Sequence, residues 1–563
     1  MKNMKKYIVG IAGMGLLSFF PSCNVLDVEP TDSFTDEAVW SDLALAETYL
    51  NNSYIDIVAE NSDLVRFASL TDEVHQRHTY WTEHMLDGTL GPDYPYFAIG
   101  YGSSKYNMWS YYYGAIKKVN YFLEHIDGVS ENGNGEWKGV LKGQAYFLRA
   151  YFYHMLYSLF GRVVLIDHTF GLDSEFTESR ADMDDVADFI VSDCDKAIDL
   201  LPTVYESADD FGRATKGAAL ALKGRTLLYK ASPLFGTPSA AKWQAAADAN
   251  KAVIDLGVYY LQSVSSSDDY ANLFLDPNNP EVIFEKLFDT QYKVNDSNVS
   301  FLHQAPCGTG SGFNGWGTME PTVEVVDRFQ NADGTDYKIE AETEYPWDNR
   351  EIRLKANILC DGDLWGYGSD KREVEVFLPG EEGVVAGLDS QEGPAYWNST
   401  LTGYSMRKFL NPNYDTNGTL SDNTPWFIFR LAEVYLNYAE CMIELGNNTE
   451  ALKYINMTRE RALLPPTTGK DIRAEYEQER QIELCFEGQR WFDLRRWKKL
   501  EESYSHPKYS ITVWKYKDGS KLYVRDMENP IRVMNWGGEK TYWMPVPRSE
   551  NQKSALIDLL PYE

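Results

Sequence analysis

Apolar residues recur at three- and four-residue intervals over most of the chain, a spacing that predicts amphipathic helices. In the first half this pattern follows six stretches: residues 36–59, 107–126, 137–160, 183–201, 214–231 and 240–256. Gly161 is predicted to cap the third helix, and Pro202 and Pro233 follow the fourth and fifth. A short apolar run, Val163–Ile166, is predicted to form a strand. The first half is therefore expected to be largely helical.

The helical pattern returns after residue 426. One apolar stripe runs from Leu431 to Leu445, and Asn447 then precedes a second helix with Glu450 three residues further on, the arrangement of a helix cap. The pair spans residues 427–462, close to the length of a tetratricopeptide repeat, although the usual signature residues of that repeat are absent. We therefore predict a mainly α protein built from stacked, tetratricopeptide-like helical hairpins.

Residues 263–425 differ in kind from the helical parts. They are rich in Gly, Pro, Asn, Asp and aromatic residues, show no sustained helical period and are too numerous for one loop. We predict an irregular subdomain that lies across the helices. Near the carboxyl terminus, two alternating runs flank Asp518-Gly519 in ITVWKYKDGSKLYV and predict a β-hairpin. Small sheets are thus expected beside the helical body.

Charge is densest in ERQIELCFEGQRWFDLRRW, residues 479–497, where acids and arginines recur three and four residues apart. Gly488 is predicted to end a helix that runs through Glu487. Such a network is either an active site or a structural clamp, and buried ion networks are more often structural. We predict a clamp formed by Glu483, Glu487, Arg490 and Asp493.

The amino terminus has the pattern of a secretory signal. Three lysines among the first six residues precede an apolar run from Tyr7 to Phe20, and Ser22 stands directly before Cys23. A small residue before a Cys is how bacterial lipoprotein signals end, so we predict removal of residues 1–22 and lipidation of Cys23. Ordinary signal cleavage near Cys23 is the alternative. Residues 23–35 would form an extended tether close to the lipid.

The chain is strongly acidic, with 84 acidic and 53 basic residues and a formal net charge of −31. Loss of residues 1–22 would remove three lysines and no acids, which takes the charge to −34. This charge argues against nucleic acid and anionic membrane surfaces as partners. The cysteines beyond Cys23 are odd in number and lack CxxC spacing, so neither a disulfide framework nor a zinc site is predicted.

Candidate catalytic and metal-binding residues are few. His75, His78 and His84 lie near Glu73 and Glu83, but no HExxH pattern is present, and we interpret these histidines as loop or solvent-facing residues rather than metal ligands. The chain contains no GxSxG motif and no P-loop, and its carboxylates are too numerous for a glycosidase pair to be either picked out or excluded. These residues single out no catalytic residue, and we predict no metal and no cofactor.

Aromatic residues are the most distinctive chemical feature. Eleven of the 34 residues from Tyr80 to Tyr113 are aromatic, against 14% of the whole chain. Those up to Tyr101 lie among Gly, Pro and Asp, where side chains tend to face solvent. The irregular middle continues the pattern with Phe313, Trp316, Trp347, Trp365, Tyr367, Tyr396 and Trp397. Sugar rings have apolar C–H faces that stack on Trp and Tyr, so an aromatic platform fits a neutral glycan; alternatively, each ring packs a loop onto the body.

The chain resembles the SusD/RagB family of outer-membrane nutrient-binding lipoproteins in eight segments, which follow in the family's order: CNVLDVEPTD, MWSYYYGAIKKVNYFLEHI, RAYFYHMLYSLFG, RATKGAALALKGRTLLY, RLAEVYLNYAE, ALKYINMTRERA, ERQIELCFEGQRWFDLRRW and YWMPVP. Val164 departs from the proline usual at that place. The resemblance covers nearly the whole chain. It implies a tetratricopeptide-like helical body, no catalysis, and capture of glycans or peptides for a SusC-like TonB-dependent transporter.

Ligand contacts in that family come from variable aromatic residues, and two places in this chain correspond by location. The first precedes MWSYYYGAI, in an aromatic loop at residues 80–106, and the second precedes EPTVEVVDRF. The ligand-binding residues that the resemblance implies are Trp81, Tyr94, Tyr96, Tyr101, Phe313, Asn314 and Trp316.

The resulting hypothesis divides the chain into five parts: a signal (1–22), a tether (23–35), a helical part (36–262), an irregular ligand-binding subdomain (263–425), and carboxyl-terminal helical pairs with a β-hairpin (426–563). We expect an outer-membrane protein, anchored through a lipid on Cys23 and facing the cell exterior, that binds an oligosaccharide and delivers it to the transporter without cleaving it. A RagB-like peptide binder is the first alternative, and a surface glycoside hydrolase is the second.

Overall fold

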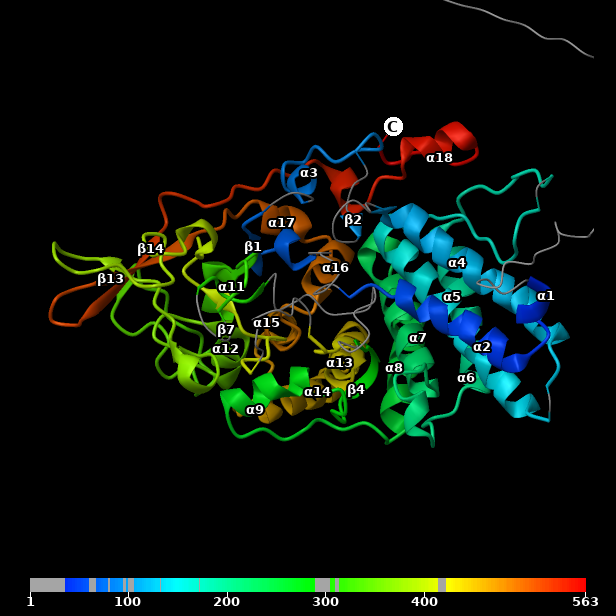
Figure 1. Ribbon diagram of the computed structural model, residues 1–563, viewed down its shortest axis with the longest axis horizontal. Helices are drawn as coiled ribbons and strands as arrows, with labels where there is room; N and C mark the ends of the chain where they lie inside the picture. Colours follow the sequence, from blue (N-terminus) through cyan, green and yellow to red (C-terminus); the bar gives the residue numbers. More distant parts are fainter. Residues whose placement is uncertain are drawn as a thin grey trace, which may run out of the picture.

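The computed structural model describes residues 36–59, 67–78, 82–94, 98–99, 106–131, 133–171, 173–288, 304–308, 313–413 and 422–562 (Figure 1). The predicted signal, the tether and Cys23 lie outside these ranges. Within them, no helix combines the length and the apolar character needed to cross a membrane. The fold is mainly α with small sheets, as the sequence predicts.

The amino-terminal helices form one end of the molecule, at the right of Figure 1. They are α1 (Asp36–Val39), α2 (Leu43–Asn51), α4 (Met108–His125), α5 (Gly135–Phe160), α6 (Met183–Leu200), α7 (Lys216–Ala231) and α8 (Ala240–Asp255). From α4 to α8, each helix packs against the next along the chain. Their apolar stripes supply much of the largest hydrophobic core. The bounds of these five helices agree with the predicted bounds to within two residues, and Gly161 ends α5 with a φ of +67°.

The predicted helix over residues 36–59 is wrong in its continuity, because the chain breaks between α1 and α2. The carboxylate of Asp42 accepts from the amide of Ala44 (2.8 Å) and so starts a new helix at that point. After α2 the chain continues as a 3-10 helix, Asn52–Asp56.

The predicted strand over Val163–Ile166 is also wrong. Only Val164 forms a β-bridge, with Arg180. The hydroxyl of Tyr113 accepts from the amide of Val164 (2.8 Å) and donates to its carbonyl (2.8 Å), and Tyr153 bonds Ile166 in the same way. Because two tyrosines satisfy this backbone, the segment needs no strand partner.

The carboxyl-terminal helices pack beside this body. They are α13 (Leu431–Glu444), α14 (Asn448–Arg461), α15 (Ile472–Glu483), α16 (Gln489–Arg496), α17 (Leu500–Tyr504) and α18 (Arg548–Lys553). α13 packs against α8 and α14, which joins the two helical parts. The side chain of Asn447 accepts from the amide of Glu450 (3.3 Å), so the predicted cap of α14 is confirmed.

The helix predicted to run through Glu487 ends earlier, at Glu483. Residues 484–488 form a turn in which Phe486 (φ +64°) and Gly488 (φ +74°) both adopt the left-handed conformation. Gly488 therefore precedes α16 and does not cap α15. A phenylalanine in this conformation carries steric strain, which the surrounding packing must offset.

The irregular middle forms the opposite end of the molecule and has its own hydrophobic core. Its short elements are α9 (Ser267–Asn272), β5 (Met319–Pro321), α11 (Val323–Arg328), β6 (Glu342–Thr343), α12 (Ile352–Asn357), β7 (Ile358–Leu359), β8 (Leu364–Trp365), β9 (Arg372–Glu373), β10 (Leu378–Pro379) and β11 (Ser405–Met406). β4 (Val282–Lys286) pairs antiparallel with β12 (Trp426–Arg430), which ties the flanks of this region together.

The predicted β-hairpin is present in this end of the molecule. β13 (Ser510–Lys515) pairs antiparallel with β14 (Lys521–Asp526), and the two form the centre of a four-stranded sheet in the order β10-β13-β14-β6. The amino-terminal half also contains small elements: β1 (Val74–Gln76), α3 (Glu83–Leu86) and the pair of β2 (Ala98–Ile99) with β3 (Tyr106–Asn107).

Candidate ligand-binding surface

Strand pairing brings together the flanks of the two segments that are predicted to contact a ligand. β1 pairs antiparallel with β5, with His75 opposite Glu320. Beyond the strands, the amide of Arg77 donates to the carbonyl of Thr318 (3.0 Å). The chain that leads into the aromatic loop therefore lies beside the chain that leaves segment 313–317.

A third segment, from the irregular middle, completes this surface. Residues Tyr396–Asn398 form a 3-10 helix, η8. The guanidinium of Arg77 donates to the carbonyl of Tyr396 (3.4 Å), and Nε2 of His78 shares a hydrogen bond with Oδ1 of Asn398 (3.3 Å). η8 is thus fastened to the residues that follow β1.

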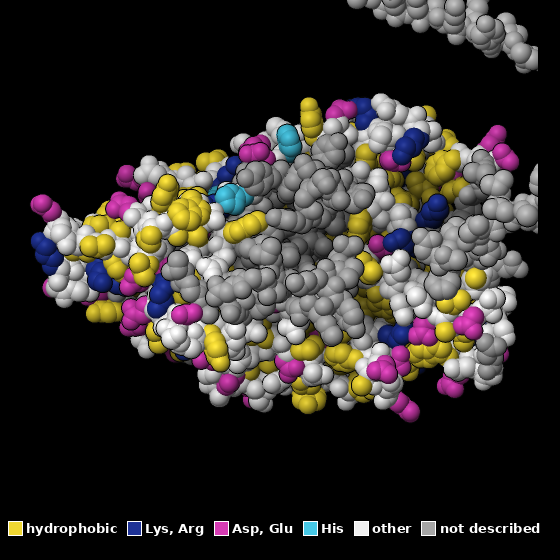
Figure 2. Space-filling model, in the orientation of Figure 1, with side chains coloured by type: hydrophobic (Ala, Val, Ile, Leu, Met, Phe, Trp, Pro, Cys, Tyr) yellow, Lys and Arg dark blue, Asp and Glu magenta, His cyan; other side chains and the backbone are white. Residues whose placement is uncertain are grey.

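Two aromatic rings of η8 face solvent. Tyr396 is 61% exposed and Trp397 is 58% exposed, and their ring centroids lie 5.7 Å apart in an edge-to-face arrangement. Trp397 is the only tryptophan among the exposed large apolar side chains of the described residues. Figure 2 shows hydrophobic and histidine side chains together near β1 on one face of the molecule. Exposed rings beside amide and imidazole groups suit a ligand with both apolar faces and hydroxyl groups.

Four of the seven predicted ligand-binding residues are described by the structure, whereas Trp81, Tyr96 and Tyr101 lie outside the described ranges. Tyr94 is 58% exposed, and its ring stacks on that of His84 with centroids 5.4 Å apart. One ring face is therefore backed by protein while the side chain stays accessible, and its contact with a ligand stays a prediction.

Phe313 is fully buried, at 0% exposure. The guanidinium carbon of Arg372 lies 3.6 Å from its ring centroid, and Arg372 makes two hydrogen bonds of 2.7 Å to Asp389. In this conformation the ring packs its segment onto the subdomain and offers no face for stacking. Asn314 and Trp316 are half-buried.

Tyr396 and Trp397 are among the aromatic residues noted in the sequence. They lie outside the two places that the family resemblance indicates for ligand contacts, so they were not predicted as contacts. Their sequence signal is an adjacent aromatic pair within GPAYWNST, between residues that favour turns. That signal is weak, since the proximity of η8 to His78 arises from pairing across more than three hundred residues.

Two ionisable side chains in the β1–β5 pair are buried. Burial lowers the pKa of His75 to about 3, and the positive charges of Lys508, Arg532 and Arg77 act in the same direction. Burial raises the pKa of Glu320 to about 8, although the guanidinium of Arg77, at 3.7 Å, offsets part of the effect. Both groups are therefore mainly uncharged at neutral pH, and this strand pair gives the surface little charge of its own.

No group of three or more His, Cys, Asp or Glu side chains placed to hold a metal ion is found in the described part of the chain. The three neighbouring histidines have separate contacts and do not converge on one site. His78 contacts Asn398 and His84 stacks on Tyr94. His75 lies buried in β1, which corrects the expectation that it is a loop or solvent-facing residue.

The four residues predicted as a clamp lie in a buried ion cluster, defined here as Glu483, Glu487, Arg490, Asp493 and their partners. Glu483 accepts from Arg353 of α12 (3.1 Å), from Arg430 of β12 (2.8 Å) and from Arg461 of α14. Burial alone would raise the pKa of Glu483, but the three guanidinium groups hold it far below its ordinary value. The carboxylate stays ionised and joins four elements.

The other acids of the cluster also have two cationic partners each. These are Lys408 (2.7 Å) and Arg430 (2.6 Å) for Glu487, and Arg480 (2.7 Å) and Arg496 (2.8 Å) for Asp493. Arg490 pairs with Asp72 (2.8 Å), two residues before β1. The ion cluster therefore reaches the base of the strand that supports the candidate surface.

Comparison with known proteins places these features in a family. Residues 280–560 match a family model described as the SusD family, and residues 25–228 match a second model described as starch-binding and associating with the outer membrane. A SusD-like protein of Formosa agariphila is 25% identical over 535 residues, which cover 89% of this chain and 92% of the relative. A SusD-like protein of Bacteroides ovatus is 22% identical over 413 residues, or 69% and 65% of the two chains.

Solved structures show the same architecture. The crystal structure of a SusD-like protein from Bacteroides fragilis superposes with a TM-score of 0.79 at 27% identity and covers 94% of this chain and 99% of its own. A laminarin-binding SusD-like protein superposes with a TM-score of 0.66 at 20% identity, over 93% and 100% of the two chains. The second likeness concerns the fold alone.

Proposed function

The chain belongs to the SusD/RagB family, and on this premise we propose that it binds a glycan at the cell surface and delivers it to a SusC-like TonB-dependent transporter. The observation that carries the proposal is the exposed edge-to-face pair of Tyr396 and Trp397 beside His78 and Asn398. The description of the matched family as starch-binding and the laminarin-binding relative support a glycan as the ligand class.

The chemistry of the surface favours an uncharged, polyhydroxylated ligand. The exposed rings of η8 provide stacking faces for sugar C–H groups, and the amide of Asn398 and the imidazole of His78 can exchange hydrogen bonds with hydroxyls. His75 and Glu320 in the supporting strands are mainly neutral near pH 7. A ligand that needs ion pairs would find no compensating charge from these two groups.

Trp81, Tyr96, Tyr101, Tyr94, Asn314 and Trp316 remain the proposed further contacts. The proximity of the two flanking segments, through the hydrogen bond between Arg77 and Thr318, supports a site to which both predicted places contribute. Phe313 would support that site from below, because its ring is buried under Arg372.

The protein would act at the outer membrane, as the family description indicates. We further propose that a lipid on Cys23 anchors it, that residues 23–35 serve as a tether and that the aromatic surface faces the exterior. A Cys23→Ala variant should leave the membrane fraction and appear in soluble fractions. Retention of that variant in the outer membrane would exclude lipid anchoring.

Affinity electrophoresis and calorimetry on a panel of neutral polysaccharides, with laminarin and starch included, test the glycan proposal. We expect retardation and a measurable Kd for at least one glycan, with no shorter products after prolonged incubation. Binding of peptides without binding of any glycan would favour the RagB-like alternative. Release of shorter sugars would favour a hydrolase. Copurification with a TonB-dependent transporter tests the delivery step.

A further inference from the structure

A second concave region lies away from η8, between α4, residues 164–176 and α18. Its volume is about 420 Å³, within the range of small-molecule sites. Figure 2 shows a hollow lined by hydrophobic side chains beside α18, with Lys or Arg side chains near its edge. Its lining is mainly apolar and aromatic: Trp109, Tyr113, Ile116, Phe170, Phe176 and Ile557.

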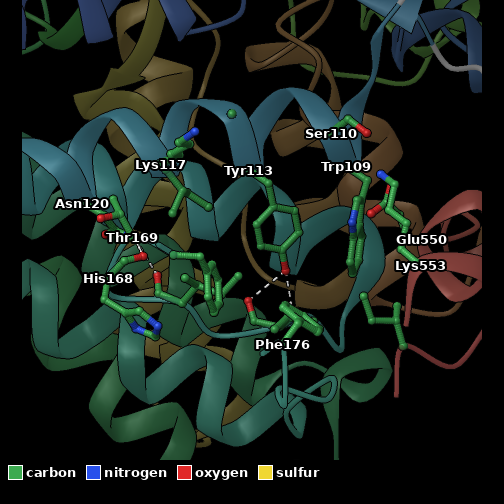
Figure 3. Close-up of a pocket in the computed structure, with 16 residues that line it drawn as sticks. Trp109, Ser110, Tyr113, Lys117, Asn120, His168, Thr169, Phe176, Glu550 and Lys553 are labelled. Atoms are coloured by element: carbon green, nitrogen blue, oxygen red, sulfur yellow. Dashed lines mark hydrogen bonds and ion pairs between the residues drawn. The ribbon is translucent and has the colours of Figure 1, made fainter. Parts of the chain in front are cut away.

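Hydrogen bonds between the surrounding segments hold the walls of this cavity in place. The hydroxyl of Tyr113 is bonded to Val164, and the side-chain amide of Asn120 donates to the carbonyl of Ile166 (3.0 Å) (Figure 3). These hydrogen bonds fix the segment against α4 through the polar edges of the two side chains. The cavity therefore keeps its shape without an occupant, as expected of a preformed binding site.

Aromatic side chains follow one another along the outer wall. His168 and Phe170 have ring centroids 4.8 Å apart, and Phe170 and Phe176 have centroids 5.7 Å apart. Phe170 is among the exposed large apolar side chains of the described residues. A row of rings with an exposed member favours a planar, apolar ligand that stacks or packs edge-on.

Gly114 gives an independent indication that space is kept here. A glycine in a helix interior costs about 1 kcal/mol relative to alanine. At Gly143 and Gly224 the structure explains the glycine, because a Cβ there would lie 2.9 Å from Leu200 and 2.8 Å from Asn250. At Gly114, in the cavity lining, no described atom outside its own turn of helix lies within 4 Å of the Cβ position. No described neighbour requires this glycine, and the space in front of it is open.

Charged side chains at the rim of the cavity indicate which charge an apolar ligand should carry. The lining includes two lysines, Lys117 on α4 and Lys553 on α18, and one acid, Glu550 (Figure 3). Lys553 pairs with Glu550 (2.8 Å), whereas Lys117 has no ion-pair partner among the described residues. Among the described residues that line the cavity, Lys117 therefore supplies one positive charge without an ion-pair partner, which favours a ligand with an anionic end.

We propose that this cavity is a second ligand site, separate from the glycan surface, that takes a small aromatic carboxylate. The ring would lie among Trp109, Tyr113 and Phe170, and the carboxylate would meet the ammonium of Lys117. No covalent step is involved. The proposal does not depend on glycan binding, because the cavity shares no residue with η8 or with the β1–β5 pair.

Calorimetry with 4-hydroxycinnamate tests the site, with the neutral 4-hydroxycinnamyl alcohol as the matched ligand and 8-anilinonaphthalene-1-sulfonate as a fluorescent reporter. The wild type should bind the acid more tightly than the alcohol. Lys117→Gln should weaken the acid about threefold, as expected of one exposed ion pair, and leave the alcohol unchanged. Equal affinity of the wild type for both compounds would overturn the anionic part of the proposal.

The series Gly114→Ala, Gly114→Leu and Gly114→Phe tests whether the ligand occupies the cavity. Affinity should fall with side-chain size, by about tenfold or more for leucine, while the melting temperature stays at or above the wild-type value. Gly139→Ala in α5 is the matched control, since its Cβ would meet Leu200 at an ordinary 3.9 Å, and it should leave binding unchanged. Wild-type affinity in Gly114→Leu, or no binding of any probe by the wild type, would exclude the site. If the wild type binds none of the probes and Gly114→Leu associates poorly with the transporter, the cavity would instead receive a side chain of the transporter.

Discussion

The ion cluster around Glu483 and the ring pair of η8 differ in how their side chains meet the rest of the protein. In the cluster most charged groups are buried, and Glu483, Glu487 and Asp493 each have at least two cationic partners. In η8, large apolar rings stay exposed, and the backbone rather than the rings is fastened to Arg77. Burial with many partners is typical of groups that maintain a fold, whereas costly exposure is typical of groups that wait for a ligand.

The two regions meet at one segment. Asp72 pairs with Arg490, and Glu73 accepts from the amide of Phe486 (3.4 Å) in the strained turn before α16. Directly after these residues, β1 leads to Arg77 and His78 at the candidate surface. The cluster thus supports the surface through backbone geometry. Substitutions in the cluster are therefore expected to lower stability, and substitutions in η8 are expected to lower affinity for the ligand.

The largest expected effect is on stability and comes from Glu483→Ala. The substitution leaves Arg353, Arg430 and Arg461 buried without this shared carboxylate, so the free energy of unfolding should fall by about 3–5 kcal/mol. Denaturant titration measures this loss. Glu477→Ala, on the same helix but partly exposed with Arg473 and Lys499, is the matched control and should cost about 1 kcal/mol or less. Equal losses for the two variants would contradict a special role for the cluster.

Arg490→Ala should cost about 2 kcal/mol at neutral pH, less than Glu483→Ala because its ion pair is partly exposed. Burial raises the pKa of Asp72, but Arg490 more than compensates and holds it at about 2. Since the folded pKa lies below the unfolded one, the stability from this pair is present above about pH 4 and is lost as the pH falls toward 2.

Unfolding curves of Arg490→Ala and wild type at neutral and acid pH measure this dependence. The difference between the two proteins should shrink on acidification. Glycan affinity of the folded fraction should remain at the wild-type value. A loss of affinity at unchanged stability would mean that Arg490 acts on the surface and not on the fold.

Trp397→Ala should lower glycan affinity and leave stability nearly unchanged, the opposite of what is expected for Arg490→Ala. More than half of the side chain is exposed, so stability should change little, while glycan affinity should fall about tenfold, which is ~1.4 kcal/mol. Calorimetry on a glycan that the wild type binds provides the measurement. Tyr260→Ala, which removes an exposed ring just after α8, is the matched control and should bind normally. Unchanged affinity in Trp397→Ala would remove η8 from the binding surface.

Local features of the chain could be predicted because their causes are local. The bounds of α4 to α8, the Asn447 cap of α14 and the hairpin β13–β14 follow from periodicity, caps and turn residues within a few positions. The partners of the charged stretch could not be predicted in this way. Of its ion pairs, Asp493 with Arg496 has the helical spacing that the sequence suggests, whereas Arg353 and Arg430 approach Glu483 from 130 and 53 residues away.

The candidate surface shows the same limit. Sequence position indicates two aromatic places, and the pairing of β1 with β5 shows why their flanks are neighbours. Sequence position does not indicate that Phe313 is buried, since its burial depends on Arg372 of β9 and on Asp389, which come later in the chain. The approach of η8 to His78 likewise depends on tertiary packing.

Glu320→Gln tests whether the strands below the surface are uncharged, through the pH dependence of stability. The pKa of Glu320 is raised to about 8 in the folded protein, above its unfolded value, so its favourable contribution is present below about pH 4.5 and is lost as the pH rises toward 8. Wild-type stability should therefore lose about 1 kcal/mol from this group between about pH 6 and about pH 7. Glutamine keeps the neutral shape without the titration, so the variant should be more stable at alkaline pH and show a flatter profile. Parallel pH profiles for the two proteins would mean that Glu320 is ionised in the folded state, and the surface would then rest on a negative charge.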